Sequence, residues 1–308
     1  IITMVYYLFT KNKFSTCIYK FHWDKTMFIS MFKFAGWTMF GAFSFATMSQ
    51  GINILLNIFF NPIVNAARAI AFQISGQIFS FVNNFQVAVG PQLIKYYAAG
   101  EYSQMKKLYY QSSKLSYYLL YIIALPVFLE MNLLLTWWLK KVPDYTVLFA
   151  RLVILDTLIY CMSGTLIHLV QATGKNKFYE IGVGTILLLN VPISYTFLKI
   201  GYPAEITMII TIVLSLFGLF FKLFFIKLRL NFSVSEYFNN VILKNIIISV
   251  ISIIIPLYLY LKLEENFIQF LLVGFSSVTS SIVSIYYIGL SQHEKSLIIN
   301  LIKSKLKW

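Results

Sequence analysis

The feature that most constrains this chain is a succession of long apolar stretches, which leaves little sequence for anything else. A helix needs about 20 mainly apolar residues to cross a hydrocarbon core of about 30 Å. Eight such stretches follow the first 27 residues, at approximately 28–59, 62–89, 114–138, 146–171, 178–199, 204–227, 244–262 and 266–290. Because a lipid-embedded backbone must satisfy its own hydrogen bonds, the pattern predicts an all-α integral membrane protein, a polytopic helical bundle.

Composition and charge agree with a membrane protein. Only 12% of the 308 residues are charged, whereas soluble domains carry about 25%. A net charge of +14 would suggest nucleic acid as partner of a soluble protein. However, alternating the helices across a membrane leaves on one side only six of the 25 basic residues, namely Arg68, Lys140, Lys141, Arg151, Lys199 and Lys262. The positive-inside rule then accounts for the charge and predicts a cytoplasmic C-terminus, and no nucleic-acid partner is expected.

The chain divides into three expected parts. Residues 1–27 are interpreted as the end of a preceding transmembrane helix and a cytoplasmic loop, which makes the sequence a fragment of a longer protein. Residues 28–227 hold six helices, and 228–308 hold two more, with a possible short interfacial helix in 228–243. The tail 294–308 has the pattern of an amphipathic helix on an anionic leaflet, with a simple cytoplasmic tail as the alternative.

Polar residues recur at helical spacing on the first two of these stretches. Asn61 and Pro62 predict a helix end followed by a capped restart. The two stripes comprise Gln50, Asn53 and Asn57 on one helix, and Gln73, Gln77, Ser80 and Asn84 on the next. We expect the helices 28–59 and 62–89 to pack against each other and these seven side chains to line a water-filled, substrate-binding cavity. Hydrogen bonds between helices, worth about 0.6–2 kcal/mol each, are the alternative explanation.

Three charges lie at membrane depth, where each costs about 2.5–3.5 kcal/mol at a helix centre. Arg68 either binds a phosphate-bearing substrate or extends to the external headgroups. Asp156 is a candidate ion-coupling residue, or else the partner of a basic residue elsewhere. Glu130 is the second ion-coupling candidate, and an interfacial carboxylate is the alternative.

Motifs for catalysis are absent from the sequence. His22, His168 and His293 lack metal-ligand spacing, and Cys17 and Cys161 form no disulfide framework. There is also no GxxxxGK[ST] phosphate loop. We therefore expect no enzyme activity, no metal and no cofactor.

One resemblance covers about residues 28–180. The run MFKFAGWTMFGAFSFATMSQGINILLNIFFNPIVNAARAIAFQISGQ resembles the seventh and eighth helices of Wzx-type polysaccharide flippases of the MOP superfamily, relatives of MATE exporters and the MurJ flippase. PQLIKYYAAGEYSQMKKLYYQSSK and LVQATGKNKFYE are similar to two of that family's cytoplasmic loops. Asn61 stands where the family pattern has Gly.

The resemblance implies the C-terminal lobe of a MATE-like or MurJ-like flippase fold plus two appended helices. It implies an undecaprenyl-diphosphate-linked oligosaccharide as substrate, such as an O-antigen repeat unit. This substrate would be flipped from the cytoplasmic to the outer leaflet of a bacterial inner membrane, among membrane lipids and other glycan-assembly proteins. Arg68 and the polar stripes are the expected substrate-binding residues.

Two other functions remain open at this stage. A cation-coupled multidrug exporter of the MATE type has the same fold, but is expected to carry an aromatic and carboxylate pocket instead of amide stripes. An integral-membrane glycosyltransferase or glycan polymerase would share the substrate, but is expected to have a sizeable external loop with catalytic residues. The external loops here are short.

Overall fold

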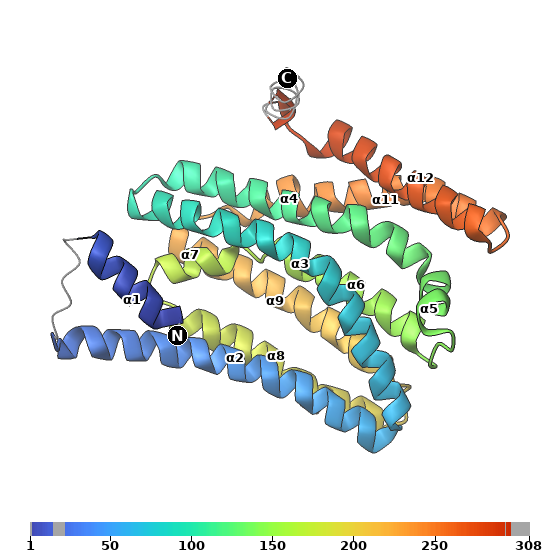
Figure 1. Ribbon diagram of the computed structural model, residues 1–308, viewed down its shortest axis with the longest axis horizontal. Coiled ribbons are helices and arrows are strands. Elements are labelled where there is room, and N and C mark those ends of the chain that lie inside the picture. The colour runs from blue at the N-terminus through green and yellow to red at the C-terminus, as the bar shows by residue number, and fades with distance from the viewer. Residues whose placement is uncertain (1, 15–21, 293, 297–308) are drawn as a thin grey trace. The chain divides into compact units, whose positions relative to one another are not determined.

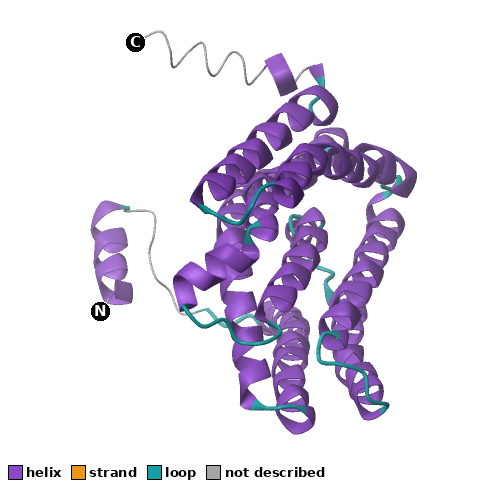
Figure 2. Ribbon diagram, turned by 90° about the vertical axis from the view of Figure 1, so that its right-hand side faces the viewer, coloured by secondary structure: helices purple, strands orange, loops and turns teal. Residues whose placement is uncertain are grey.

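The computed structural model describes residues 2–14, 22–292 and 294–296. The described residues are 87% helical, and they form helices and loops without a strand (Figure 2). The expected all-α fold class is therefore confirmed. The helices run in the order α1 (Ile2–Lys13), α2 (Lys25–Phe59), α3 (Pro62–Ala98), α4 (Tyr102–Leu129), α5 (Met131–Leu139), α6 (Thr146–Met162), α7 (Leu166–Ala172), α8 (Lys177–Lys199), α9 (Ile206–Leu230), α10 (Val234–Tyr237), the π-helical turn η1 (Phe238–Ile242), α11 (Leu243–Lys262), α12 (Phe267–Ser284) and the π-helical turn η2 (Ile285–Gly289).

The chain forms two compact units, residues 1–36 and residues 37–308. The first unit holds α1 and the initial turns of α2. The second holds the rest of α2 and all later helices, and every contact described below lies within it.

Seven helical segments among the described residues are long and apolar enough to cross a membrane. They comprise α2, α4, residues 146–172 with α6 and α7, α8, α9, residues 234–262 with α10 and α11, and residues 267–289 with α12. The chain is thus a multi-pass membrane protein. The eighth expected span, 62–89, lies in α3, a helix of 37 residues that stays below the hydropathy of the other seven. Its arginine and its Asn and Gln side chains are the physical reason.

The bundle is built around α3, α4 and α6. Each of these helices packs against the other two, α6 also packs against α9, and α9 packs against α8 (Figure 1). On the other side, α11 and α12 pack together and against α4. Polar bonds cross this packed region: Ser75 Oγ lies 2.6 Å from Thr157 Oγ1, and Gln86 Nε2 donates to the carbonyl of Cys161 at 3.0 Å. The core around α3 therefore includes satisfied polar groups as well as apolar side chains.

The expected packing of the first two spans against each other is wrong. Asn61 does cap α3, because its side chain accepts bonds from the N–H groups of Ile63 and Val64, but α2 and α3 diverge from this turn (Figure 1). Residues 37–59 of α2 lie along α8 instead. The physical reason is a set of small residues between those two helices, where Gly51 faces Val191 and Gly184 faces Phe40 and Ser44.

Several connections differ from the expected loops. The expected cytoplasmic loop after residue 89 is mostly helical, because α3 continues through Pro91 and α4 begins after a turn at Gly100, whose φ of +74° suits glycine. The stretch 114–138 bends at Glu130, between α4 and α5. The stretch 146–171 is interrupted at Ser163–Thr165, between α6 and α7. Pro and small residues at these places permit local departures that hydropathy does not register.

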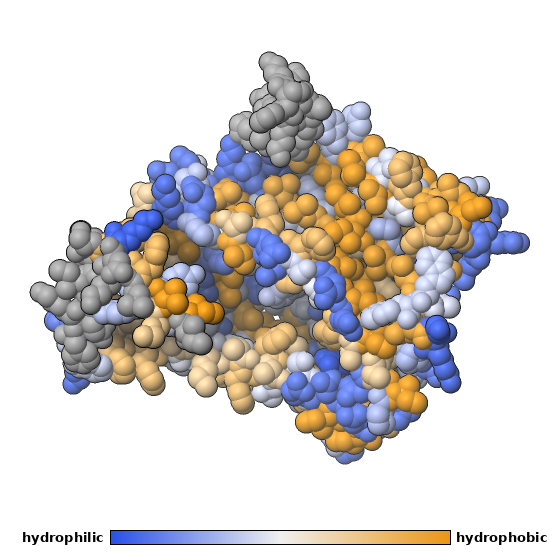
Figure 3. All heavy atoms as spheres, viewed as in Figure 1, coloured by the Kyte–Doolittle hydropathy of each residue, from blue (hydrophilic) through white to orange (hydrophobic). Residues whose placement is uncertain are grey.

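The expected short helix in 228–243 is present as α10, which Ser233 caps by accepting a bond from the N–H of Glu236 at 3.2 Å. The expected amphipathic tail begins inside the described residues at Glu294, but 297–308 lie outside them. Exposed apolar side chains cover the outer faces of α11 and α12, including Ile254 and Phe275. Figure 3 shows this apolar surface over α12. A surface of this kind is suited to lipid.

Candidate functional site

Arg68 lies in a groove between the divergent helices α2 and α3, which we call the Arg68 groove. It is lined by Ser49, Asn53, Asn57, Pro62, Asn65, Ala66, Arg68, Ala69 and Phe72, and its volume is about 650 Å³. The arginine side chain is buried, with 6% of its surface exposed. It is therefore not extended into solvent at this end of the bundle.

The guanidinium group has few partners. Its Nη1 donates to Asn53 Oδ1 at 2.5 Å, and its plane lies over the Phe72 ring, 4.5 Å from the centroid. Its Nε is buried without a hydrogen-bond partner, and no carboxylate among the described residues pairs with it. A buried cation that keeps free donors is a binding group for an anion, because Arg presents its donors in a planar fork.

Amides surround this cation. Asn53 Nδ2 donates to Gln50 Oε1 at 3.1 Å, which leaves Asn53 Oδ1 for Arg68. Asn65 Nδ2 reaches the backbone carbonyl of Asn53 at 3.5 Å, and Asn57 is exposed in the same groove. The polar stripe of α2 and the Arg68 side chain therefore meet in one groove, and the hydrogen bond between Arg68 and Asn53 connects them directly.

The stripe of α3 lies elsewhere. Gln73 and Gln77 line a different, mainly apolar groove between α3, α4 and α5, and Ser80 and Asn84 are exposed. Since side chains turn by about 100° per residue along a helix, the faces of Arg68 and Gln77 are nearly opposite. The expectation that the stripes of α2 and α3 line one common cavity is thus wrong within this chain. The cause is the register of α3, which turns Gln73 and Gln77 toward α4 and α5 and away from the face on which Arg68 meets α2.

Glu130 belongs to neither groove. It is buried at the bend between α4 and α5, where its Oε1 accepts a hydrogen bond from Gln269 Nε2 of α12 at 3.1 Å. This bond ties the bend to α12. Glu130 therefore has a hydrogen-bond partner inside the bundle, Gln269.

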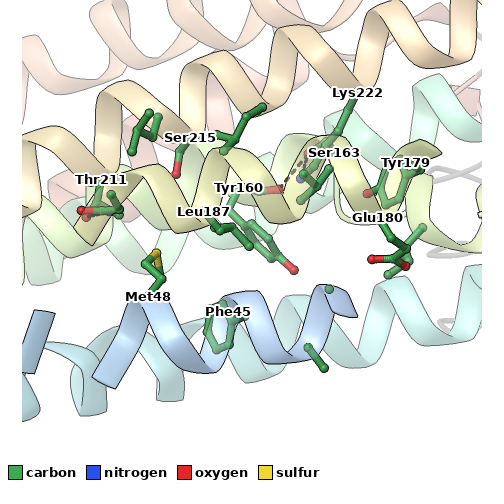
Figure 4. Close-up of a pocket in the computed structure, with 18 of the residues that line it drawn as sticks. Phe45, Met48, Tyr160, Ser163, Tyr179, Glu180, Leu187, Thr211, Ser215 and Lys222 are labelled. Carbon is green, nitrogen blue, oxygen red and sulfur yellow. Dashed lines mark hydrogen bonds between the residues drawn. The ribbon is translucent and has the colours of Figure 1, made fainter. Parts of the chain in front are cut away.

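Asp156 lines a second cavity, of about 400 Å³, which we call the charged cavity. Its walls come from α2, α6, α7, α8 and α9. Figure 4 shows Lys222 of α9 reaching Ser163 at the end of α6, and the Tyr160 ring pointing into the cavity toward α2. Two charged residues join Asp156 there, Glu180 in the first turn of α8 and Lys222 in α9. Asp156 Oδ1 is buried without a hydrogen-bond partner.

Lys222 and Glu180 were not foreseen as site residues. Lys222 counts as a loop lysine in the charge asymmetry, but it is buried in α9, where its Nζ donates to Ser163 Oγ at 3.2 Å. Its place inside an apolar run, two turns before the helix end, was the available signal. The charge asymmetry survives its removal. Glu180 gave no such signal, because Lys175 and Lys177 stand shortly before it and its charge therefore resembles that of an ordinary loop residue.

A metal site does not emerge from these groups. No cluster of three or more His, Cys, Asp or Glu side chains that could hold a metal occurs in the described ranges. Cys161 is buried as a free thiol. Comparison with protein-family models, with curated proteins and with solved structures gives no significant match.

Proposed function

We propose that this chain is part of a bacterial inner-membrane flippase that moves a lipid-linked oligosaccharide with a diphosphate linkage, as in the Wzx-type polysaccharide flippases. The observation that carries the proposal is the Arg68 groove, where a buried guanidinium has no carboxylate partner among the described residues. Such a group favours a phosphate oxygen over any neutral ligand.

The surroundings of Arg68 fit the three parts of such a substrate. The guanidinium suits the diphosphate, and the amides of Asn53, Asn57 and Asn65 offer donors and acceptors for sugar hydroxyls. Exposed apolar side chains on the same helix, including Ile54 and Ile58 of α2, suit a polyprenyl chain. In this proposal the C-terminus is cytoplasmic, as the charge asymmetry predicts.

The test measures display of the glycan on cells that carry variants of the full-length protein. Arg68→Ala should reduce display about tenfold or more, since a hydrogen bond to a charged group contributes about 1.5–3 kcal/mol. Arg68→Lys should retain part of the display, because the point charge remains without the planar fork. The matched control is Arg229→Ala, which removes an exposed arginine in the last turn of α9. Wild-type display in an Arg68→Ala variant with normal membrane levels would overturn the proposal.

One observation favours a second candidate, a cation-coupled multidrug exporter. The charged cavity combines Asp156 and Glu180 with the aromatic side chains of Phe45, Tyr160 and Tyr179. Carboxylates and aromatic faces together bind organic cations. Lys222 opposes this function, because its ammonium group faces the same cavity. Uptake of a fluorescent organic cation into vesicles that contain the full-length protein, lost in Asp156→Asn, would favour the exporter.

A further inference from the structure

Two buried polar atoms in the Arg68 groove have no hydrogen-bond partner among the described residues, and they are of opposite kinds. Arg68 Nε is a donor, and Asn65 Oδ1 is an acceptor. Both residues line the groove, one turn apart on α3. Because buried polar groups in proteins are almost always hydrogen-bonded, an open donor and an open acceptor in one groove point to a ligand that satisfies both.

Asn53 fixes which atoms stay open. Its Oδ1 accepts from Arg68 Nη1, and its Nδ2 donates to Gln50 Oε1 at 3.1 Å. Asn65 Nδ2 lies 3.5 Å from the backbone carbonyl oxygen of Asn53, and only the nitrogen of an amide can donate to a carbonyl. The Asn65 amide therefore cannot turn round without losing this bond, and its oxygen is the atom that remains open.

One small ligand group can reach both open atoms. Side chains three residues apart on a helix have their Cβ atoms about 5–6 Å apart. The groove has a volume of about 650 Å³, and the small, exposed side chains of Ala66 and Ala69 line it beside Asn65 and Arg68. No carboxylate occurs among the described residues that line the groove. The negative charge that complements Arg68 must therefore come from the ligand.

On the basis of the proposed function, in which this groove holds a phosphate-bearing ligand, we propose that Asn65 determines which anions the groove accepts. It selects a phosphate group that stands beside a hydrogen-bond donor. The anionic oxygen accepts from Arg68, and the neighbouring donor binds Asn65 Oδ1. An anion without such a donor leaves Asn65 Oδ1 buried and unpaired, which is how a site that binds a hydroxyl rejects the analogue that lacks it.

Two sources supply this chemistry. Free phosphate keeps a P–OH group at neutral pH. In a lipid-linked glycan both phosphates are esterified, so that the donor is a hydroxyl or an amide N–H of the adjoining sugar. A neutral acceptor at position 65 suits either source, because a carboxylate there would oppose the anion and cancel the charge of Arg68. Asn65 is thus a specificity-determining residue, whereas Arg68 supplies the charge.

The test is isothermal titration calorimetry of the full-length protein in detergent, at mildly alkaline pH, with two pairs of anions. Hydrogenphosphate and sulfate have the same charge and nearly the same shape, but only hydrogenphosphate carries a hydroxyl. A hexose 1-phosphate and its 2-deoxy analogue differ in one sugar hydroxyl, and their phosphate has lost its own proton above a second pKa of about 6. In at least one pair the member with the donor should bind about tenfold or more tightly, and that pair identifies the source. Equal affinities within both pairs would overturn the proposal.

Variants of Asn65 assign the preference to this side chain. Asn65→Leu should remove the preference and keep the affinity for sulfate, because Arg68 remains. Asn65→Ala gives the same comparison if Asn65→Leu does not fold. The matched control is Asn83→Leu, which removes an exposed amide of α3 outside the groove and should keep the preference. A preference that survives in the Asn65 variants would show that another residue makes the selection.

Arg68→Ala separates this role of Asn65 from the proposed function itself. It should weaken the binding of all four anions about tenfold or more. If Arg68→Ala loses binding but the wild type does not discriminate within either pair, the role of Asn65 is wrong and the phosphate site stands. Unchanged binding of all four anions in Arg68→Ala would contradict the proposed function.

Discussion

Arg68 on α3 donates a hydrogen bond from its Nη1 to Asn53 Oδ1 on α2, which connects two helices that otherwise separate from their common turn. The neutral amide at position 53 holds the guanidinium without cancelling its charge. The charge therefore stays available to an anion that enters the groove.

The first prediction replaces this amide by a carboxylate of the same shape. In Asn53→Asp the new charge pairs with Arg68, so we expect display of the glycan to fall about tenfold or more while the protein remains folded. The thermal unfolding midpoint should stay equal or rise, since a buried cation gains a partner. Asn84→Asp, which adds the same charge on an exposed face of α3, is the control. Undiminished display in Asn53→Asp would show that Arg68 does not need a free charge.

The second prediction concerns the small residues between α2 and α8. Gly184→Leu places a side chain against Phe40 and Ser44 of α2 and should destabilise the protein by about 1–3 kcal/mol, the usual effect of overpacking. Gly76→Leu on α3 is the matched control, because nothing lies within 4 Å of the added Cβ. Thermal unfolding in detergent measures both variants. Equal midpoints for the two would mean that α2 does not depend on this close contact.

The third prediction tests which face of α3 meets water. In a background without Cys17 and Cys161, cysteine at Gln73 or Asn84 should react with a water-soluble maleimide, since both side chains are exposed. Cysteine at Ser75, which is buried against Thr157, should not react. Thiols react as thiolates, which form in water and not in hydrocarbon. Protection of Gln73 and Asn84 in intact membranes would place these side chains against lipid or protein.

The fourth prediction is a pH dependence of stability at Glu294, shortly after η2. Glu294 accepts a bond from the N–H of Ser291 at 2.7 Å and pairs with Lys114 of α4 at 3.1 Å. Burial alone would raise the pKa of Glu294, but the bond from Ser291 and the charge of Lys114 together hold that pKa below its ordinary value of 4.5. A carboxyl with a lowered pKa in the folded state stabilises the fold above pH 4.5, and this stability is lost as the pH falls through the lowered pKa.

Thermal unfolding of wild type and Glu294→Gln between neutral pH and pH 3 measures this contribution. At neutral pH the variant should be less stable by about 1–3 kcal/mol, because Lys114 loses its charged acceptor. At the acidic end the difference should shrink. A difference that is constant over the whole range would show that the ion pair contributes no stability.

Much of the fold could be predicted from the sequence. Hydropathy over about 20 residues is a local property, so the apolar spans, the all-α class and the cap at Asn61 follow from the residues themselves. The same locality explains why Asp156 was identified as unusual, since a charge in an apolar run is visible without a partner. Lys222 carries the same signal but was assigned to a loop, because it stands only five residues before Lys227 and the basic end of its helix.

What only the tertiary structure decided is which faces meet. Helical spacing assigns Asn53 and Gln77 to polar stripes, but it does not say that α2 leaves α3 and follows α8. That choice depends on the fit between Gly51 and Val191 and between Gly184 and Phe40, residues more than 100 positions apart in the chain. For the same reason Asp156, Glu180 and Lys222 could not be assigned to one cavity from the sequence. Packing between distant small residues brings these charges together, and no local pattern encodes it.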